Sequence, residues 1–138
     1  MKYSLICLLF FPLLGSCGQI GPKYDLVCIN LGKSSLNDVH VRYNDHTFRI
    51  GYLIPTGVAT HNRADESAPI PENAMATWIT EADQKSHEAL IHVKASISPS
   101  SKRGCLIFWF DNAKAGVAWK TKEQWSQTIY KNLKPGSL

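Results

Sequence analysis

The sequence lacks the short motifs that mark the common enzyme classes. It has no Gly-x-Ser-x-Gly element, no Cys-x-x-Cys pair, no His-Glu-x-x-His zinc motif and no calcium-binding loop. Gly32-Lys33-Ser34 matches the end of a phosphate-binding loop, but Val27 stands where that loop needs its first glycine. We therefore expect no catalytic residues, no bound metal and no cofactor.

Blocks of like charge are also absent. The 138 residues carry 15 lysines and arginines and 11 aspartates and glutamates, and the formal net charge is +4. A protein that binds nucleic acid needs basic residues gathered on one face, whereas here both signs are interspersed along the chain. No internal repeat is evident either. The composition therefore favours a single domain that binds no nucleic acid.

The chain has no apolar run long enough to cross a bilayer, which takes about 20 residues. Its N-terminal apolar stretch extends from Tyr3 to Leu14, follows the basic residue Lys2, and ends at the small residues Gly15 and Ser16. A short basic start, a short apolar run and small residues after it are typical of a secretory signal peptide. The sequence thus predicts export.

The stretch Leu14-Gly15-Ser16-Cys17 resembles the lipobox of bacterial lipoproteins, in which an aliphatic residue and two small residues precede the lipid-bearing cysteine. The resemblance implies cleavage before Cys17, a diacylglyceryl group on its sulfur and an acyl chain on its new amino group. Each buried lipid methylene adds about 0.8 kcal/mol of membrane affinity, so several chains anchor a domain durably. The alternative is an ordinary secretory signal with an incidental cysteine.

The same resemblance predicts the organisation and location of the chain. Residues 1–16 form the signal peptide that is removed, residues 17–23 carry the lipid and form a short tether, and residues 24–138 form one domain. In many Gram-negative lipoproteins an aspartate after the cysteine favours the inner membrane, and here Gly18 occupies that position. We expect a lipid-anchored protein of the bacterial cell envelope, in the outer membrane and facing the periplasm.

Cysteine is scarce, and its four positions are informative. Cys7 leaves with the signal peptide and Cys17 takes the lipid, so Cys28 and Cys105 remain in the domain. Paired cysteines persist as disulfides in an oxidising periplasm, and a bridge between these two would contribute about 4 kcal/mol by loop-entropy arguments. Both lie in apolar runs, however, and free cysteines are among the most buried residues. The sequence favours the disulfide, with two buried free thiols as the alternative.

Short apolar or alternating segments separated by turn residues fill most of the domain. Residues 39–43, Val-His-Val-Arg-Tyr, alternate in the manner of a strand with one buried face. Residues 105–110 are the most apolar segment and predict a central strand. The strands expected from such patterns are 24–31, 38–43, 47–53, 58–61, 75–80, 89–94, 105–110 and 117–120.

The end of the chain has a helical pattern instead. The segment 121–124, Thr-Lys-Glu-Gln, has the form of a capping box, and Trp125, Ile129 and Leu133 follow at helical spacing. We expect an all-β fold, an immunoglobulin-like antiparallel sandwich of about seven strands with a short C-terminal helix. Trp78 lies far from both domain cysteines, so the Cys–Trp–Cys spacing of true immunoglobulin domains is not met.

Part of the domain is similar to a group of small uncharacterised bacterial lipoproteins. The similarity spans about residues 26–94 and includes the alternation at 39–43, Gly51-Tyr52-Leu53, and Pro69-Ile70-Pro71 before the segment of Trp78. It implies a β-rich fold and no known activity.

The domain offers few candidate site residues. Its five histidines, at positions 40, 46, 61, 87 and 92, lack the short fixed spacing of a zinc site, and we interpret them as scattered surface residues. The polar segment 62–73 is the candidate recognition loop, because binding residues concentrate on loops over a rigid scaffold. Within it, Arg63, Asp65 and Glu66 are the residues we expect to contact a protein partner.

These observations favour a non-enzymatic lipoprotein that binds a protein partner in the envelope, with the membrane as its second partner through the lipid anchor. An alternative is an immunity lipoprotein that neutralises a toxin delivered to the periplasm, which the residues do not separate from the first. A metal-assisted hydrolase built on the histidines and a structural component of an envelope machine are further alternatives.

Overall fold

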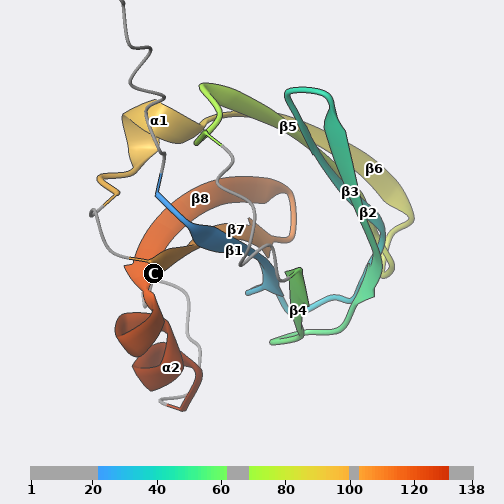
Figure 1. The fold of residues 1–138 in the computed structure, drawn as a ribbon. Helices are drawn as coiled ribbons and strands as arrows, with labels where there is room; N and C mark the ends of the chain where they lie inside the picture. Colours follow the sequence, from blue (N-terminus) through green and yellow to red (C-terminus); the bar gives the residue numbers. More distant parts are fainter. Residues whose placement is uncertain (1–21, 62–68, 100–102, 131–138) are drawn as a thin grey trace, which may run out of the picture.

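The computed structural model describes residues 22–61, 69–99 and 103–130, which form a β-sandwich (Figure 1). The strands of this described part are β1 (Tyr24–Asn30), β2 (Leu36–Tyr43), β3 (His46–Leu53), β4 (Val58–His61), β5 (Asn73–Thr80), β6 (Lys85–His92), β7 (Gly104–Asp111) and β8 (Lys114–Thr121). The helices are α1 (Val93–Ser96) and α2 (Lys122–Tyr130). None of the described helices is long and apolar enough to span a membrane.

The strands form two four-stranded sheets. The first sheet has the order β4-β1-β7-β8, and the second sheet has the order β3-β2-β5-β6. Every neighbouring pair is antiparallel except β1 and β7, which run parallel with Leu26 opposite Leu106. The predicted all-β sandwich with a C-terminal helix is therefore confirmed, with eight described strands and one parallel pair that was not expected. The strand order differs from the A-B-E-D and C-F-G orders of the immunoglobulin constant domain, so the likeness is one of layered architecture.

The main core lies between the two sheets. As the alternation predicted, Val39, Val41 and Tyr43 point inward from β2 and are at most 3% exposed. Trp78 of β5 meets Phe110 of β7 edge to face with ring centroids 5.2 Å apart. Aromatic pairs in this geometry add about 0.5–1.5 kcal/mol beyond the burial of their area, so this contact helps to join the two sheets near the β7–β8 turn.

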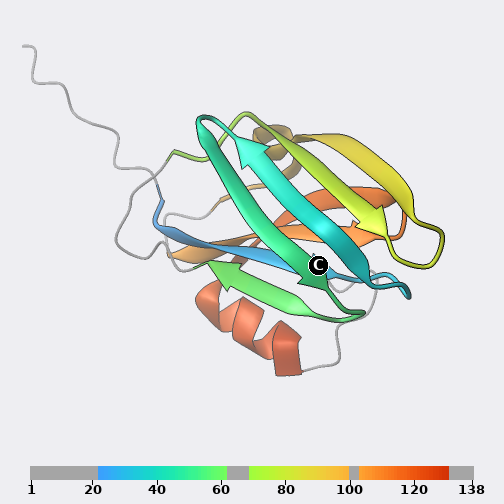
Figure 2. The same cartoon turned by 90° about the vertical axis from the view of Figure 1, so that its right-hand side faces the viewer.

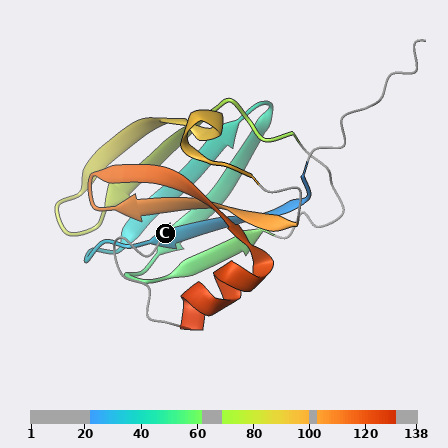
Figure 3. The ribbon, with the colours of Figure 1, turned by 90° about the vertical axis from the view of Figure 1, so that its left-hand side faces the viewer.

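A second, smaller core lies on the outer face of the first sheet, where α2 covers it (Figure 3). Trp125 of α2 is 7% exposed and packs among side chains of β1 and β7 such as Ile29 and Ile107. The predicted capping box is present, because the Gln124 N–H donates to the Thr121 hydroxyl and the Thr121 N–H donates to the Gln124 side chain, at 3.2 and 2.9 Å.

The chain between β6 and β7 differs from the prediction. A strand was expected to continue through residue 94, but β6 ends at His92 and α1 begins at Val93. The N–H of Val93 donates to the carbonyl of Glu72 at 2.9 Å, and the N–H of Lys94 is within 3.4 Å of the same oxygen. These bonds turn the chain into a helical segment, and Val93 is fully buried in the main core.

Candidate functional site

Several of the predicted site residues lie outside the described residues. These are Cys17, the expected lipidation site, and Arg63, Asp65 and Glu66 of the expected recognition loop. The signal peptide and most of the predicted tether also lie outside the described residues. The structure therefore bears on the domain that the tether would carry.

The predicted disulfide is wrong, because Cys28 and Cys105 are free and buried. They lie on the neighbouring parallel strands β1 and β7, but Cys28 stands opposite Phe108 and Cys105 opposite Asp25. Cys28 points into the core between the sheets, and Cys105 points into the core under α2. The sheet itself separates the two thiols, so the alternative of two buried free thiols is confirmed.

Burial also decides the chemistry of these thiols. Loss of solvation raises the pKa of Cys28 to about 12. Burial raises the pKa of Cys105 to about 11, with a further upward contribution from Asp25 and smaller downward ones from Lys122 and Arg103. Since the thiolate is the reactive form of cysteine, both residues are packing groups at neutral pH.

The histidines whose side chains are described are dispersed. His40 lies on the outer face of β2, 3.2 Å from Asp38, and His92 bonds the side chain of Asn73 at 2.7 Å. His87 stacks on Trp78 with ring centroids 5.3 Å apart. Within residues 22–61, 69–99 and 103–130, no group of three or more histidine, cysteine or acidic side chains is arranged to hold a metal.

One cluster superficially resembles a nucleophile with its base. The Thr80 hydroxyl donates to Asp83 and lies 3.0 Å from the Nε2 atom of His87. The hydroxyl has one proton, and its bond to Asp83 is the main cause that lowers the pKa of that carboxyl. With that proton on the Asp83 side, His87 must donate to Thr80 and does not act as its base. These contacts therefore connect β5 to the turn and to β6 within the hairpin.

The two outer faces of the sandwich differ in what covers them. Helix α2 packs on the outer face of the first sheet. Figure 2 shows the second sheet from its outer side, where no described helix lies over it. We call this surface the open face. Its side chains come from alternate residues of β2, β3, β5 and β6, for example Arg42, Met75 and Leu90.

Strand register aligns three of these side chains in a row. Arg42 stands opposite Met75, and Met75 stands opposite Leu90, so the row crosses β2, β5 and β6. Leu90 is 57% exposed, the highest value among the large hydrophobic side chains of the described residues. A large exposed apolar side chain beside arginine and methionine has the composition of interface cores, which are enriched in methionine and arginine.

A groove opens along one side of the sandwich, between β3 and β4. Its volume is about 470 Å³, and its apolar lining includes Leu26, Phe48 and Ala59. Polar groups line the rest, notably Asp45, His46, Thr47, Arg49 and Thr60. Volumes of about 300–1,000 Å³ are usual for ligand sites. The groove therefore combines an apolar interior with a hydrogen-bonding rim.

Neither the open face nor the groove was predicted from the sequence. The row on the open face joins residues from three strands, and only the register brings Arg42, Met75 and Leu90 together. The sole local signal was that Arg42 falls on the polar side of a predicted alternating strand. Asp45 and His46, which are neighbours in the chain, both line the groove.

Comparison with known proteins yields little beyond this geometry. No known protein family matches the sequence, and no curated protein matches it either. A protein from Eubacterium rectale solved by NMR aligns over 77% of this chain and 92% of its own, with 17% identity and a TM-score of 0.44.

Proposed function

We propose that this chain is a lipid-anchored lipoprotein of the bacterial cell envelope whose β-sandwich binds a protein partner and catalyses no reaction. Cys17 carries the lipid and holds the domain at the outer membrane, facing the periplasm. The proposal of an anchor is supported by the lipobox-like stretch 14–17 that follows the short apolar run.

The observation that carries the binding proposal is the row of Arg42, Met75 and Leu90 on the open face. A four-stranded sheet commonly leaves one face to solvent, and that face is then polar. Here Met75 lies between Arg42 and Leu90, and Leu90 is largely exposed. A protein partner that covers this row would bury an apolar strip flanked by arginine, which is one of the residues enriched in interface hot spots.

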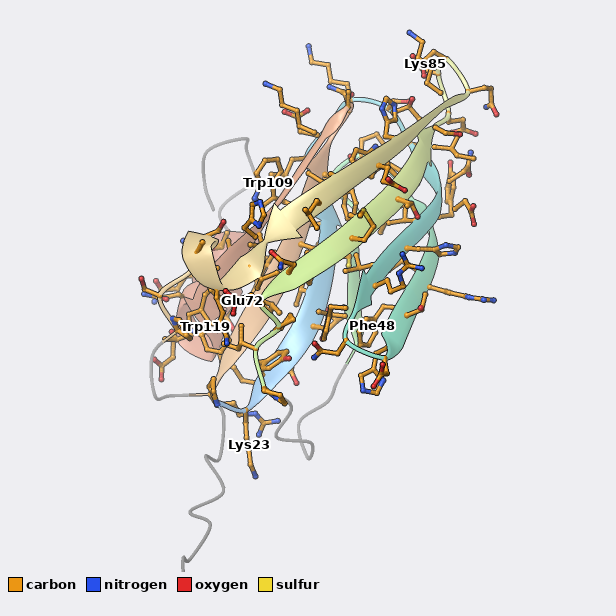
Figure 4. All side chains as sticks on the ribbon, turned by 90° about the horizontal axis from the view of Figure 1, so that it is seen from above. Lys23, Phe48, Glu72, Lys85, Trp109 and Trp119 are labelled. Atoms are coloured by element: carbon orange, nitrogen blue, oxygen red, sulfur yellow. The ribbon has the colours of Figure 1, made fainter. Side chains whose placement is uncertain are left out.

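The charges around this row support a protein surface as the partner. Within the strands β2, β3, β5 and β6 the basic residues other than histidine are Arg42, Arg49 and Lys85, and Lys85 lies at the hairpin end of β6, away from Leu90 (Figure 4). Arginine is enriched and lysine depleted at protein interfaces. Arginine pairs with carboxylates in a bidentate geometry, so the partner surface is expected to offer acidic side chains around an apolar centre.

Mass spectrometry of the full-length protein from native membranes tests the anchor. We expect a mass that lacks residues 1–16 and carries lipid on Cys17, and a Cys17→Ser variant that is released from the membrane or remains unprocessed. An unmodified Cys17 in the wild-type protein would overturn the lipoprotein part of the proposal.

Quantitative cross-linking in the same membranes tests the binding surface. Leu90→Asp places a charge in the apolar row and is expected to reduce partner capture about tenfold, which corresponds to about 1.4 kcal/mol. Gln127→Asp, at an exposed position of α2 on another surface, is the matched control and should capture as the wild type does. Equal capture by all three proteins would exclude the open face. A captured toxin would make this chain an immunity protein.

A further inference from the structure

The groove lies between two strands that each end a sheet. Among the described residues β3 pairs only with β2, and β4 pairs only with β1, so each strand keeps one free edge. The connection 54–57 joins them at one end, and Figure 2 shows that they diverge from that end. The groove residues Thr47, Arg49 and Thr60 lie toward the open end.

The register of the β2–β3 hairpin determines which backbone groups face the free edge of β3. The two-residue turn 44–45 makes Tyr43 and His46 a hydrogen-bonded pair. Because hydrogen-bonded and non-hydrogen-bonded pairs alternate, Thr47 occupies a non-hydrogen-bonded position, as does Arg49 two residues later. The N–H and C=O groups of these two residues therefore point away from β2 and toward the groove.

The same alternation applies to β4. The Asn30 N–H donates to the carbonyl of Gly57 at 3.1 Å, so Asn30 and every second residue before it bond toward β4. Cys28 and Ala59 are then a hydrogen-bonded pair, and Thr60, the neighbour of Ala59, turns its N–H and C=O to the free edge. Two free strand edges thus border an apolar interior.

These two edges lack the lysines and prolines that usually protect such strands, although the pairing of β3 with β2 has a bulge between Arg49 and Gly51, near the connection to β4. Proteins guard free strand edges with lysine, proline or bulges. The edge strands on the opposite side carry Lys85 in β6 and Lys114 and Lys120 in β8, and β6 and β8 also contact each other. Neither β3 nor β4 contains a lysine or a proline. The groove side is therefore the side on which another strand can pair.

We propose that the groove binds an extended segment of the protein partner, which adds as a strand to the free edge of β3 and alternates apolar with acidic side chains. This inference rests on the proposed protein-binding function and adds its mode and chemistry. Main-chain hydrogen bonds to Thr47 and Arg49 supply affinity in such strand addition, and pockets for alternate side chains supply specificity. The apolar side chains enter the groove over Phe48 and Ala59.

The charges beside β3 determine which side chains the partner segment should carry on its other side, the side that points away from the groove. Side chains that point away from the groove lie beside Arg49, which is exposed on the open face next to His40. Neither β3 nor β4 contains a carboxylate. Asp45, in the turn, is the acidic exception among the groove residues, so the acidic side chains of the partner are placed beside Arg49 and away from that turn.

The first test uses a short fluorescein-labelled peptide that alternates valine and glutamate, added to the full-length protein in detergent. We expect saturable binding by fluorescence anisotropy and slower hydrogen exchange at the amides of Thr47 and Arg49. Thr47→Pro removes the edge N–H and should weaken binding about tenfold. Thr47→Ala keeps the N–H and should bind within about twofold of the wild type.

A charge reversal keeps the inference testable even if proline disturbs the fold. Arg49→Glu should weaken binding of the valine–glutamate peptide and strengthen binding of a peptide that alternates valine and lysine. The inference is overturned by absence of binding, by equal effects of Thr47→Pro and Thr47→Ala, or by equal binding of a peptide with its valines grouped together. If Leu90→Asp still reduces capture of the partner about tenfold while the peptide does not bind, strand addition fails and the proposed function stands.

Discussion

Cys28 and Cys105 lie on adjacent strands of one sheet, and the sheet places their thiols in two different cores. Cys28 is 1% exposed between the sheets, and Cys105 is 3% exposed beneath α2. No movement short of unfolding brings the two sulfur atoms together, because successive side chains of a strand point to opposite faces. The fold therefore contains no bond between these two cysteines.

This relationship predicts the thiol chemistry of the intact protein. In the folded protein, purified without reductant, both cysteines should resist a thiol-directed alkylating reagent. In denaturant both should be labelled completely, because burial alone protects them. Peptide mapping by mass spectrometry assigns the label to each position, and a Cys28–Cys105 disulfide peptide in the wild-type protein would contradict the prediction.

The raised thiol pKa values predict a loss of stability in alkaline solution. Cys28 stays protonated in the folded protein up to a pKa of about 12, whereas in the unfolded chain it ionises above its ordinary value of 9.0. Between these values the unfolded state binds fewer protons, so the free energy of unfolding falls as pH rises. From pH 8 to pH 10 this thiol should remove about 1.4 kcal/mol.

Urea unfolding of the wild type and of Cys28→Val at pH 8 and pH 10 measures this contribution. The valine variant lacks the titrating group, so its free energy of unfolding should fall less between the two values of pH. Other groups that ionise in this range affect both proteins equally and cancel in the comparison. Equal losses in the two proteins would show that Cys28 does not carry the effect.

A salt bridge between Asp25 and Lys122 connects β1 to the start of α2. The Asp25 side chain is 7% exposed and its carboxylate lies 3.0 Å from the Lys122 ammonium. Removing one partner of a buried pair leaves an uncompensated charge. Because the Lys122 side chain is 48% exposed, we expect Lys122→Met to cost about 2 kcal/mol, somewhat less than a fully buried pair would.

A double variant separates the charge from the packing. Asp25→Asn combined with Lys122→Met removes both charges, and it should recover part of the stability lost by Lys122→Met alone. Thermal unfolding of the wild type, Lys122→Met, Asp25→Asn and the double variant, followed by circular dichroism, gives the four values needed for this cycle. Strictly additive losses would mean that the two groups do not interact energetically.

The sequence predicted local structure well where one segment contains the whole signal. The alternation at residues 39–43 is sufficient to define a half-buried strand, and the pair Thr121–Gln124 is sufficient to define the start of α2. The thiol prediction failed because it needed the register of β1 against β7. Those strands are far apart in sequence and run parallel, and a shift of one residue moves every side chain to the other face.

The open face and the groove also depend on the pairing of strands that are distant in sequence, and for that reason the sequence did not predict them. Met75 lies between Arg42 and Leu90 only after three strands have paired. The free edges of β3 and β4 depend on which strands end the sheets, and the sequence does not encode strand order locally. Local periodicity thus predicts elements, while the candidate binding surfaces depend on pairing between distant elements.

Trp109 and Gly116 face each other across β7 and β8, and the contact predicts a steric effect. A Cβ atom built on Gly116 would lie 2.3 Å from the Trp109 ring, far inside van der Waals contact. Gly116→Ala should therefore displace the indole or the strand, at a cost of about 1–3 kcal/mol. Urea unfolding measures that cost.

A smaller side chain at position 109 tests whether the ring is the cause. The other atoms closest to this Cβ also belong to the Trp109 indole, so removing the indole removes the obstacle. In a Trp109→Leu background, Gly116→Ala should cost less than in the wild type, because leucine does not extend over the neighbouring strand as the indole does. An alanine penalty of the same size in both backgrounds would place the requirement for glycine in the backbone of β8. A smaller cost of Gly116→Ala in the Trp109→Leu background would show that position 116 is glycine because the Trp109 ring lies so close to β8.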